Sequence, residues 1–310
     1  MAGGVPGGAR VSVASATYHG RIAPSPTGFL HLGHARTFWF AQERARAFGG
    51  RVSLRIDDID GPRCRPEFVD AIIEDLRWAG FDWEEPPVFQ SGRKEDYRTG
   101  LLHLVASGHA YPCYCSRRDI REAASAPHEG LDEVIYPGTC RPEQVESVAG
   151  PLGWDRFLSE YHVEREGRKP CWRFRVPDSE AVEFRDACRG PQTFLSGRQF
   201  GDFVIWRQDG IVSYQLACVL DDAAMGITEV VRGCDLLVST ARQLLLARAL
   251  DLSSPAWFHC PLLEDASGQR LAKRTAALSL RELRAAGADP RAWFEAWRRE
   301  FAGHLSVSDR

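Results

Sequence analysis

Two histidines stand three residues apart after a Pro- and Gly-rich turn, in the segment from Arg21 to Arg36. The segment is typical of a strand that ends in a turn and is followed by a helix starting near Gly33. The N-terminus of a helix presents free N–H groups and partial positive charge, which favour phosphate. If the first helical turn begins between them, His31 and His34 can both face such a ligand. The segment therefore predicts a phosphate-binding site.

Cysteine and tyrosine side chains form a second group that could do chemistry. Cys113 and Cys115 are followed by Tyr136 and Cys140. Three thiolates with a fourth donor suit a tetrahedral zinc ion, although two neighbouring cysteines alone would be a weak signal. His128 is an alternative fourth ligand. The other six cysteines are scattered, and we expect them to be small core residues: Cys64, Cys171, Cys188, Cys218, Cys234 and Cys260.

The elements that must position these residues alternate between helices and strands. Residues 33–48, 66–79 and 94–107 have the apolar spacing of helices, and residues 51–56 alternate as a half-buried strand does. This alternation predicts an α/β domain with a parallel sheet.

The alternation breaks between about residues 110 and 198, where cysteine, proline and glycine cluster, and it resumes as strand and strand-to-helix material at 202–207 and 211–220. The simplest organisation is one α/β domain split by an inserted subdomain. The predicted divisions are a mobile tail at 1–20, the α/β domain at 21–109 and 199–260, the insertion at 110–198, and a final segment at 261–310.

The last third of the chain contains three further helix signals. We expect a helix at about 240–250, with Ser239 or Thr240 as its cap. Ser279 and Glu282 have the spacing of a capping box, and Asp289 before a proline opens a final helix.

The composition limits the classes of protein that the chain can belong to. It has 310 residues, with 44% hydrophobic, 26% charged and a formal net charge of −3. These values exclude a mainly disordered chain. They do not indicate a large positively charged surface that binds nucleic acid. No run of 18 apolar residues could span a bilayer. Nine cysteines without a secretory signal favour a reducing, cytoplasmic compartment.

Residues 21–36 resemble the opening of the glutamyl branch of class I aminoacyl-tRNA synthetases, and the four residues from His31 to His34 match the HIGH motif of that family. The resemblance continues to about Lys273 and is weaker inside the insertion. Three more segments of the branch are matched in the same order, at residues 54–60, 214–222 and 226–233. The resemblance implies a Rossmann-type catalytic domain that joins an amino acid to ATP.

In this family a carboxylate oxygen of the amino acid attacks the α-phosphorus of ATP, which gives an aminoacyl adenylate and pyrophosphate. The enzyme mainly positions the reactants and stabilises charge on the phosphates. The resemblance assigns His31, Gly33 and His34 to ATP, which binds with Mg²⁺.

The family's second motif, KMSKS, is matched at residues 270–274. Lys273 would meet the pyrophosphate as a point charge and is the third implied catalytic residue, with His31 and His34. Two positions depart from the family pattern, because Arg270 stands for a lysine and Ala272 for the usual serine.

The amino acid that the resemblance implies is glutamate. Arginine offers a bidentate fork to a carboxylate, while an aspartate can accept from the α-ammonium group. Position 57 is usually glutamate in the family, so its aspartate reaches one methylene less, and Ala223 stands where histidine is common and receives no role. The family's glutamate contacts fall on Arg21, Ala23, Ser25, Asp57, Tyr214 and Arg232.

A short subfamily of the branch transfers glutamate to the queuosine base in the anticodon loop of tRNA(Asp), and it carries a zinc site in its insertion. Its ligands, three Cys and a Tyr, fit Cys113, Cys115, Tyr136 and Cys140, which implies a structural zinc with no open position. Only 37 residues follow Lys273. They are too few for the helical anticodon-binding region of a full glutamyl-tRNA synthetase. Length and zinc pattern together favour the short subfamily, whose partners are L-glutamate, ATP and queuosine-containing tRNA(Asp).

Three alternatives stay open at this point. A truncated glutamyl-tRNA synthetase would charge the 3′ end of a tRNA. A non-catalytic paralogue would bind glutamate, ATP or tRNA as a sensor, which the altered Asp57 and the segment 270–274 keep open. A nucleotide-binding α/β domain of unrelated role is the third alternative.

Overall fold

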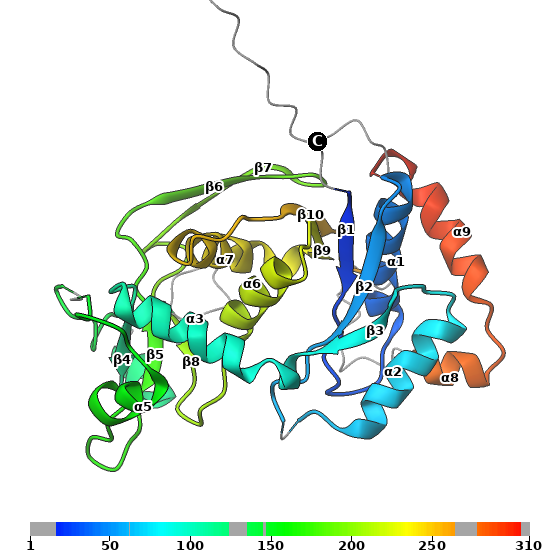
Figure 1. The fold of residues 1–310 in the computed structure, drawn as a ribbon. Coiled ribbons are helices and arrows are strands. Elements are labelled where there is room, and N and C mark those ends of the chain that lie inside the picture. The colour runs from blue at the N-terminus through cyan, green and yellow to red at the C-terminus, as the bar shows by residue number, and fades with distance from the viewer. Residues whose placement is uncertain (1–16, 62, 124–134, 145–146, 264–277, 305–310) are drawn as a thin grey trace, which may run out of the picture.

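The computed structural model describes residues 17–61, 63–123, 135–144, 147–263 and 278–304. The first three strands form a parallel sheet in the order β1-β2-β3 (Figure 1), with bounds β1 (His19–Ile22), β2 (Arg51–Ile56) and β3 (Glu84–Phe89). The parallel sheet expected from the sequence is therefore present.

A second group of strands extends this sheet beyond β1. β9 (Glu229–Gly233) and β10 (Ala256–Cys260) are parallel to each other. The backbone N–H of Thr228, just before β9, donates to the carbonyl of His19 at 2.9 Å, so β9 lies beside β1. The sheet β3-β2-β1 and the sheet that contains β9 and β10 thus meet at β1 and β9, and the order from β3 to β10 across this junction is that of a doubly wound nucleotide-binding fold.

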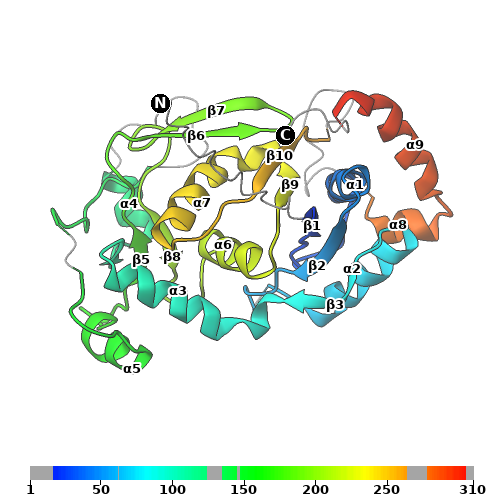
Figure 2. The same ribbon diagram turned by 45° about the horizontal axis from the view of Figure 1, so that its top comes forward.

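Residues 110–198 contribute strands to two different sheets. β6 (Ala181–Asp186) pairs with β10 in parallel, and β7 (Gly190–Leu195) pairs antiparallel with β6. A separate antiparallel sheet lies at the opposite end of the molecule from α8 and α9 (Figures 1 and 2). Its strands are β4 (Ala110–Cys113), β5 (Cys171–Phe174) and β8 (Phe203–Trp206).

The helices confirm most of the sequence-based expectations. The major ones are α1 (Leu32–Ala47), α2 (Pro66–Trp78), α3 (Lys94–Ala106), α6 (Tyr214–Ala224) and α7 (Leu237–Ala249). Short helical segments are α4 (Arg117–Ala123), α5 (Trp154–Arg156) and the turns at 90–92, 157–161, 234–236 and 302–304. Within the described residues, no helix is long and apolar enough to cross a bilayer.

The expected cap of α7 is wrong. The helix begins at Leu237 with Leu236 as its cap, so both predicted capping residues lie inside the helix. Ser239 accepts a hydrogen bond from the Gln215 side chain, and Thr240 contacts a buried arginine and histidine described below. These side chains are used for tertiary contacts, which sequence spacing alone could not distinguish from capping.

Two C-terminal helices close over α1 and α2. The capping box predicted at Ser279 and Glu282 is present at the start of α8 (Leu280–Ala285). Asp289 caps α9 (Pro290–Glu300), as expected from the proline that follows it. Figure 2 shows α9 on the outer side of α1, and the ring centroids of Trp39 and Trp297 are 5.8 Å apart between the two helices.

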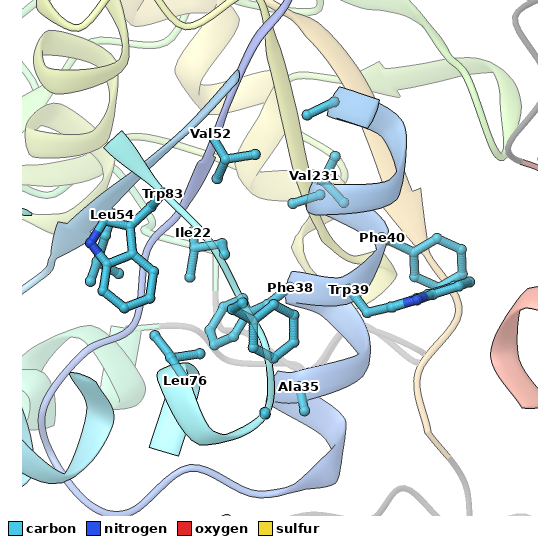
Figure 3. Packing of buried hydrophobic residues seen from close by; sticks show 14 of the residues in the cluster. Ile22, Ala35, Phe38, Trp39, Phe40, Val52, Leu54, Leu76, Trp83 and Val231 are labelled. Atoms are coloured by element: carbon cyan, nitrogen blue, oxygen red, sulfur yellow. The ribbon is translucent and has the colours of Figure 1, made fainter. Parts of the chain in front are cut away.

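The core under α1 explains why this helix is fixed against the sheet. Its residues Ala35, Phe38 and Trp39 are buried at 8% exposure or less, and Phe38 points toward the strand residue Ile22 (Figure 3). Burying side chains of this size contributes about 1.5–3 kcal/mol each. The N-terminus of α1 is therefore held rigidly at the carboxyl end of β1.

Replacing Glu229 with glutamine is expected to lower the free energy of unfolding by about 3–5 kcal/mol. The Glu229 carboxylate, at 1% exposure, accepts hydrogen bonds from Arg44 Nε and Nη2 at 2.5 and 2.7 Å and from the Tyr18 hydroxyl at 2.8 Å. The contact with Arg44 joins β9 to α1. Glutamine leaves the buried Arg44 guanidinium without its anion. Urea denaturation measures the loss, and Glu160→Gln is the matched control, since its pair with Arg156 is exposed and we expect a change below about 1 kcal/mol.

Candidate active site

The residues predicted to do chemistry gather at the carboxyl ends of the parallel strands. In doubly wound sheets ligands bind where the strand order reverses, which here is the junction of β1 and β9. The turn after β1 is tied to the end of β2, because the N–H of Asp57 donates to the carbonyl of Pro24 at 2.9 Å. Ala23 lies half-buried and Ser25 exposed in that turn.

His31 and His34 flank the first turn of α1, because the helix begins at Leu32. Their rings lie 3.8 Å apart between centroids. The N–H of Gly33 donates to Nδ1 of His31 at 3.1 Å, and the N–H of His31 donates to Nδ1 of His34 at 3.3 Å. Since both Nδ1 atoms accept, the proton of each neutral ring is on Nε2, the atom that can donate to a phosphate oxygen.

Two arginines and two aspartates form a buried network beside this turn. Arg21 Nε lies 3.2 Å from Asp222 Oδ1, and Arg55 Nη1 lies 2.6 Å from the same oxygen. Arg55 also donates to both oxygens of Asp57, at 2.6 and 3.3 Å. The two positive charges are thus balanced by two negative ones.

The pKa values of the two aspartates differ in direction. Burial opposes ionisation of Asp222, but Arg21 and Arg55 hold its pKa below its usual value. Burial raises the pKa of Asp57 despite its contact with Arg55. Both carboxylate oxygens of Asp57, which were expected to meet the α-ammonium group, accept hydrogen bonds from Arg55. The role of Asp57 in glutamate binding stays a prediction.

Arg232 is in a different electrostatic situation, although it is only 4% exposed. Its guanidinium donates to neutral acceptors: Nε to the His259 ring at 3.1 Å, Nη1 to Gln243 at 2.8 Å and Nη2 to Thr240 at 2.6 Å. In the part of the chain that the structure describes, no carboxylate forms an ion pair with it. Burying a charge without a counter-ion is costly, so this guanidinium is suited to receive an anion.

The structure brings Tyr214 and Arg21 to the same place as Arg232. The Tyr214 hydroxyl lies 3.4 Å from Arg232 Nη1, and the tyrosine is 37% exposed at the start of α6. Arg21 Nη1 donates at 3.0 Å to the carbonyl of Val231, the neighbour of Arg232. Four of the six predicted glutamate contacts, at positions 21, 57, 214 and 232, are therefore linked through one group of buried polar contacts.

Lys273, Arg270 and the rest of the KMSKS-like segment lie outside the described residues, so the predicted role of Lys273 is not tested. The described residues on both sides of that segment are anchored near the first turn of α1. Arg36 donates to the carbonyl of Pro261 at 2.9 Å, and Leu280 N–H donates to the carbonyl of Leu30 at 2.7 Å.

Three of the cysteines predicted to bind zinc come together after β4. The Sγ atoms of Cys113, Cys115 and Cys140 all lie within 4.8 Å of one another. The Tyr136 hydroxyl lies 3.4 Å from Cys113 Sγ and 3.6 Å from Cys115 Sγ, and it accepts the N–H of Cys140 at 2.7 Å. Three sulfurs and one oxygen converge as a tetrahedral zinc ion requires. His128, the alternative ligand, lies outside the described residues.

Two neighbours of this cluster were not singled out by sequence. Cys171 lies opposite Cys113 in the β4–β5 ladder, and its thiol donates to the Cys113 carbonyl at 3.3 Å. The Arg173 guanidinium carbon is 3.8 Å from the centre of the Tyr136 ring. The neighbouring Cys171, Tyr136 and Arg173 side chains lower the pKa of Cys113, although burial opposes this. These surroundings therefore favour ionisation of the Cys113 thiol.

Sequence reasoning also missed the partners of the site's arginines. Arg55 and Asp222 lie inside segments that matched the family, so the sequence showed both charged residues. It did not show that they contact each other. His259 and Gln243 gave no signal in the sequence, and Thr240 was interpreted only as a candidate helix cap. Their role depends on β9, β10 and α7 being adjacent in space.

Comparisons with known proteins agree with this geometry. A curated relative from Nitratidesulfovibrio vulgaris, named glutamyl-Q tRNA(Asp) synthetase, is 47% identical over 276 residues, covering 86% of this chain and 81% of the relative. A relative of the same name from Symbiobacterium thermophilum is 49% identical over 282 residues, covering 87% and 82%.

A solved glutamate-tRNA synthetase from Elizabethkingia anophelis superposes with a TM-score of 0.67 at 29% identity, covering 83% of this chain and 53% of that one. This chain thus spans about half the length of that solved structure. The family model for the catalytic domain of class I tRNA synthetases (E and Q) matches residues 17–306. From strand order, site geometry and this match together, the chain belongs to the class I tRNA synthetases of the E and Q type.

Proposed function

We propose that the chain activates L-glutamate with ATP and Mg²⁺ and transfers it to the queuosine base in the anticodon loop of tRNA(Asp). The observation that carries the proposal is the high identity, 47% and 49% over four-fifths of their lengths, to relatives named for this activity. Arg232, which is buried and forms no ion pair with a carboxylate among the described residues, supports an acidic substrate independently.

In the first step a carboxylate oxygen of glutamate attacks the α-phosphorus of ATP, and pyrophosphate leaves. His31 and His34 hold the phosphates through their Nε2–H groups at the N-terminus of α1, where the free backbone N–H groups add positive potential. Lys273 is proposed to meet the departing pyrophosphate. The residues contribute by orientation and charge stabilisation.

Glutamate is bound between β1, β9 and the start of α6. Arg232 supplies the positive charge for a carboxylate, and the Tyr214 hydroxyl lies beside it at 3.4 Å. Arg21, Asp57, Ala23 and Ser25 are proposed to complete the site from the β1 turn and β2. The charges of Arg21 and Asp57 are already shared within the chain, so we assign the main electrostatic attraction to Arg232.

In the second step a hydroxyl of the queuosine cyclopentenediol attacks the carbonyl carbon of the adenylate. The hydroxyl loses its proton, an ester bond forms and AMP leaves. Recognition of a base in an anticodon loop suits a protein, since the bases of single-stranded RNA are accessible to side chains.

We further propose that Cys113, Cys115, Tyr136 and Cys140 hold one structural zinc ion. With all four positions taken by protein, the ion would cross-link the loop that contains Tyr136 to the end of β4. The distances between the donors support this set, and the buried Arg173 next to Tyr136 offsets the negative charge of three thiolates.

Labelled glutamate, ATP and Mg²⁺ incubated with two bulk tRNA pools, one containing queuosine and one lacking it, test the function. We expect label only on the first pool, resistant to removal of the 3′ terminal adenosine. Equal label on both pools, lost with that adenosine, would identify an enzyme that charges the tRNA 3′ end. No label on either pool, with no glutamate-dependent pyrophosphate exchange, would identify a non-catalytic paralogue.

Gly33→Ala is expected to lower kcat/KM for ATP by about 10- to 100-fold in pyrophosphate exchange, since small displacements at a reacting site have effects of this size. A Cβ at position 33 would lie 2.9 Å from Cε1 of the His31 ring, which must then move. Gly28→Ala, in the segment between β1 and α1, is the matched control because its Cβ would meet nothing within 4 Å. Equal loss in both variants would contradict the assignment of His31 to the phosphates.

A further inference from the structure

A buried histidine and aspartate lie directly behind Arg232, outside every motif considered above. Asp186 ends β6 and His259 lies in β10, and they are 1% and 0% exposed. The ring Nδ1 of His259 is 2.6 Å from Asp186 Oδ2. Asp186 Oδ1 also accepts the N–H groups of Cys188 at 3.0 Å and Arg189 at 2.8 Å.

These contacts fix the tautomer of His259. An aspartate that accepts two backbone N–H groups is a carboxylate, so the proton between the two side chains is on Nδ1 of the ring. Nε2 therefore carries a lone pair, which faces Arg232 Nε at 3.1 Å and the Thr240 hydroxyl at 2.9 Å. Burial lowers the pKa of His259, with Arg232 acting in the same direction and Asp186 opposing it, so the ring is neutral.

We propose that His259 is a positioning residue for Arg232, and that Asp186 acts through it by fixing its tautomer. The proposal rests on the proposed function, in which Arg232 binds a carboxylate of glutamate. A neutral acceptor holds the guanidinium in place without cancelling its charge. A carboxylate at the same position would hold it equally well but would neutralise it and compete with the substrate.

The geometry around Arg232 supports these two roles, in which Arg232 binds the carboxylate and His259 positions Arg232. Each of its three guanidinium nitrogens is fixed by a different neutral side chain, from β10 at Nε and from α7 at Nη1 and Nη2. The exposed Tyr214 hydroxyl lies on the Nη1 side. His259 therefore limits the rotation of the guanidinium from its buried side. Through Asp186, which is 46 residues before Arg232 in sequence, β6 also helps to position the glutamate site.

A purely structural role is the competing explanation. Asp186 and His259 could simply attach β6 to β10, since the two strands share only the pair Trp257 and Asp186 in their ladder. Such a role would change stability, but it would not change the affinity for glutamate separately from that for ATP.

Two variants of His259 separate these explanations in glutamate-dependent pyrophosphate exchange. His259→Asn keeps a group near Nδ1 for Asp186 and loses the acceptor for Arg232. His259→Gln places an amide oxygen near the position of Nε2 and keeps the acceptor. We expect the Asn variant to raise KM for glutamate about 10- to 100-fold with KM for ATP unchanged, and the Gln variant to recover most of that loss.

His19→Asn is the matched control for loss of a buried histidine. His19 is 5% exposed in β1, and its ring contacts Ser53 at 2.8 Å through Nε2 and Arg51 at 3.3 Å through Nδ1, neither of which is assigned to the glutamate site. We expect it to lower the midpoint of urea denaturation and to leave both KM values unchanged.

The outcomes distinguish the inference from the function on which it rests. Suppose that the wild type is active. If the Asn and Gln variants then keep the wild-type KM for glutamate, or if their KM values for glutamate and ATP rise equally, the positioning role alone would be overturned. A wild type that binds ATP but shows no glutamate-dependent exchange would overturn the proposed function and the inference together.

Discussion

Arg232→Met is expected to lower kcat/KM for glutamate about 1000-fold, with KM for ATP unchanged. The substitution removes a guanidinium that is 4% exposed and that forms no ion pair with a carboxylate in the described residues. The positive charge is therefore available to the substrate, and its removal is felt mainly when glutamate binds. Pyrophosphate exchange at varied glutamate and ATP concentrations measures both parameters.

The same substitution should have little effect on stability, and this distinguishes Arg232 from a structural arginine. Arg55 is fully buried and paired with Asp57 and Asp222 at 2.6 Å each. We expect Arg55→Met to lower the free energy of unfolding by about 3–5 kcal/mol, because the buried Asp57 loses its cation and Asp222 keeps only Arg21. Arg232→Met should change it by about 1 kcal/mol or less. A large loss of stability in Arg232→Met, with unchanged KM for glutamate, would contradict the assignment.

Cys140→Ser is expected to weaken zinc binding at least about 100-fold, since the site loses one of four ligands. The purified variant should then contain well under one zinc ion per chain after dialysis against a weak chelator, while the wild type keeps about one. We also expect proteolysis between β4 and β5 to become faster in the variant, because the loop containing Tyr136 is no longer cross-linked. Elemental analysis and limited proteolysis measure the two effects.

The control for this prediction is another cysteine. Cys64→Ser removes a partly exposed thiol outside the cluster and should keep zinc at the wild-type level. Equal zinc in Cys140→Ser and wild type would show that the cluster does not bind the ion.

The local elements and the order of motifs could be predicted from sequence because each depends on nearby residues. The parallel strands, the capping box at Ser279 and the start of α1 between His31 and His34 all follow from short-range spacing. The contacts that set the charge of each site residue could not. Asp57 is predicted to meet the substrate, and the sequence did not indicate that its carboxylate also accepts a hydrogen bond from Arg55.

Long-range contacts explain the remaining differences. Thr240 has the residue type of a helix cap, yet it lies inside α7. Its hydroxyl bonds to Arg232 in β9 and to His259 in β10. Cys171 looked isolated in sequence but lies opposite Cys113 across an antiparallel ladder. Both results follow from sheet registers that join residues far apart in the chain.

The junction of β1 with β9 has a consequence for how the chain is made. About 200 residues separate Ile22 from Glu229, so a ribosome adding about 5–20 residues per second needs about 10–40 s between the two strands. During that time β1–β3 can form a half-sheet whose β1 edge has no neighbour, and open edges of this kind invite intermolecular pairing. The nascent chain is therefore most prone to aggregation, and most in need of a chaperone, before residues 229–233 leave the ribosome.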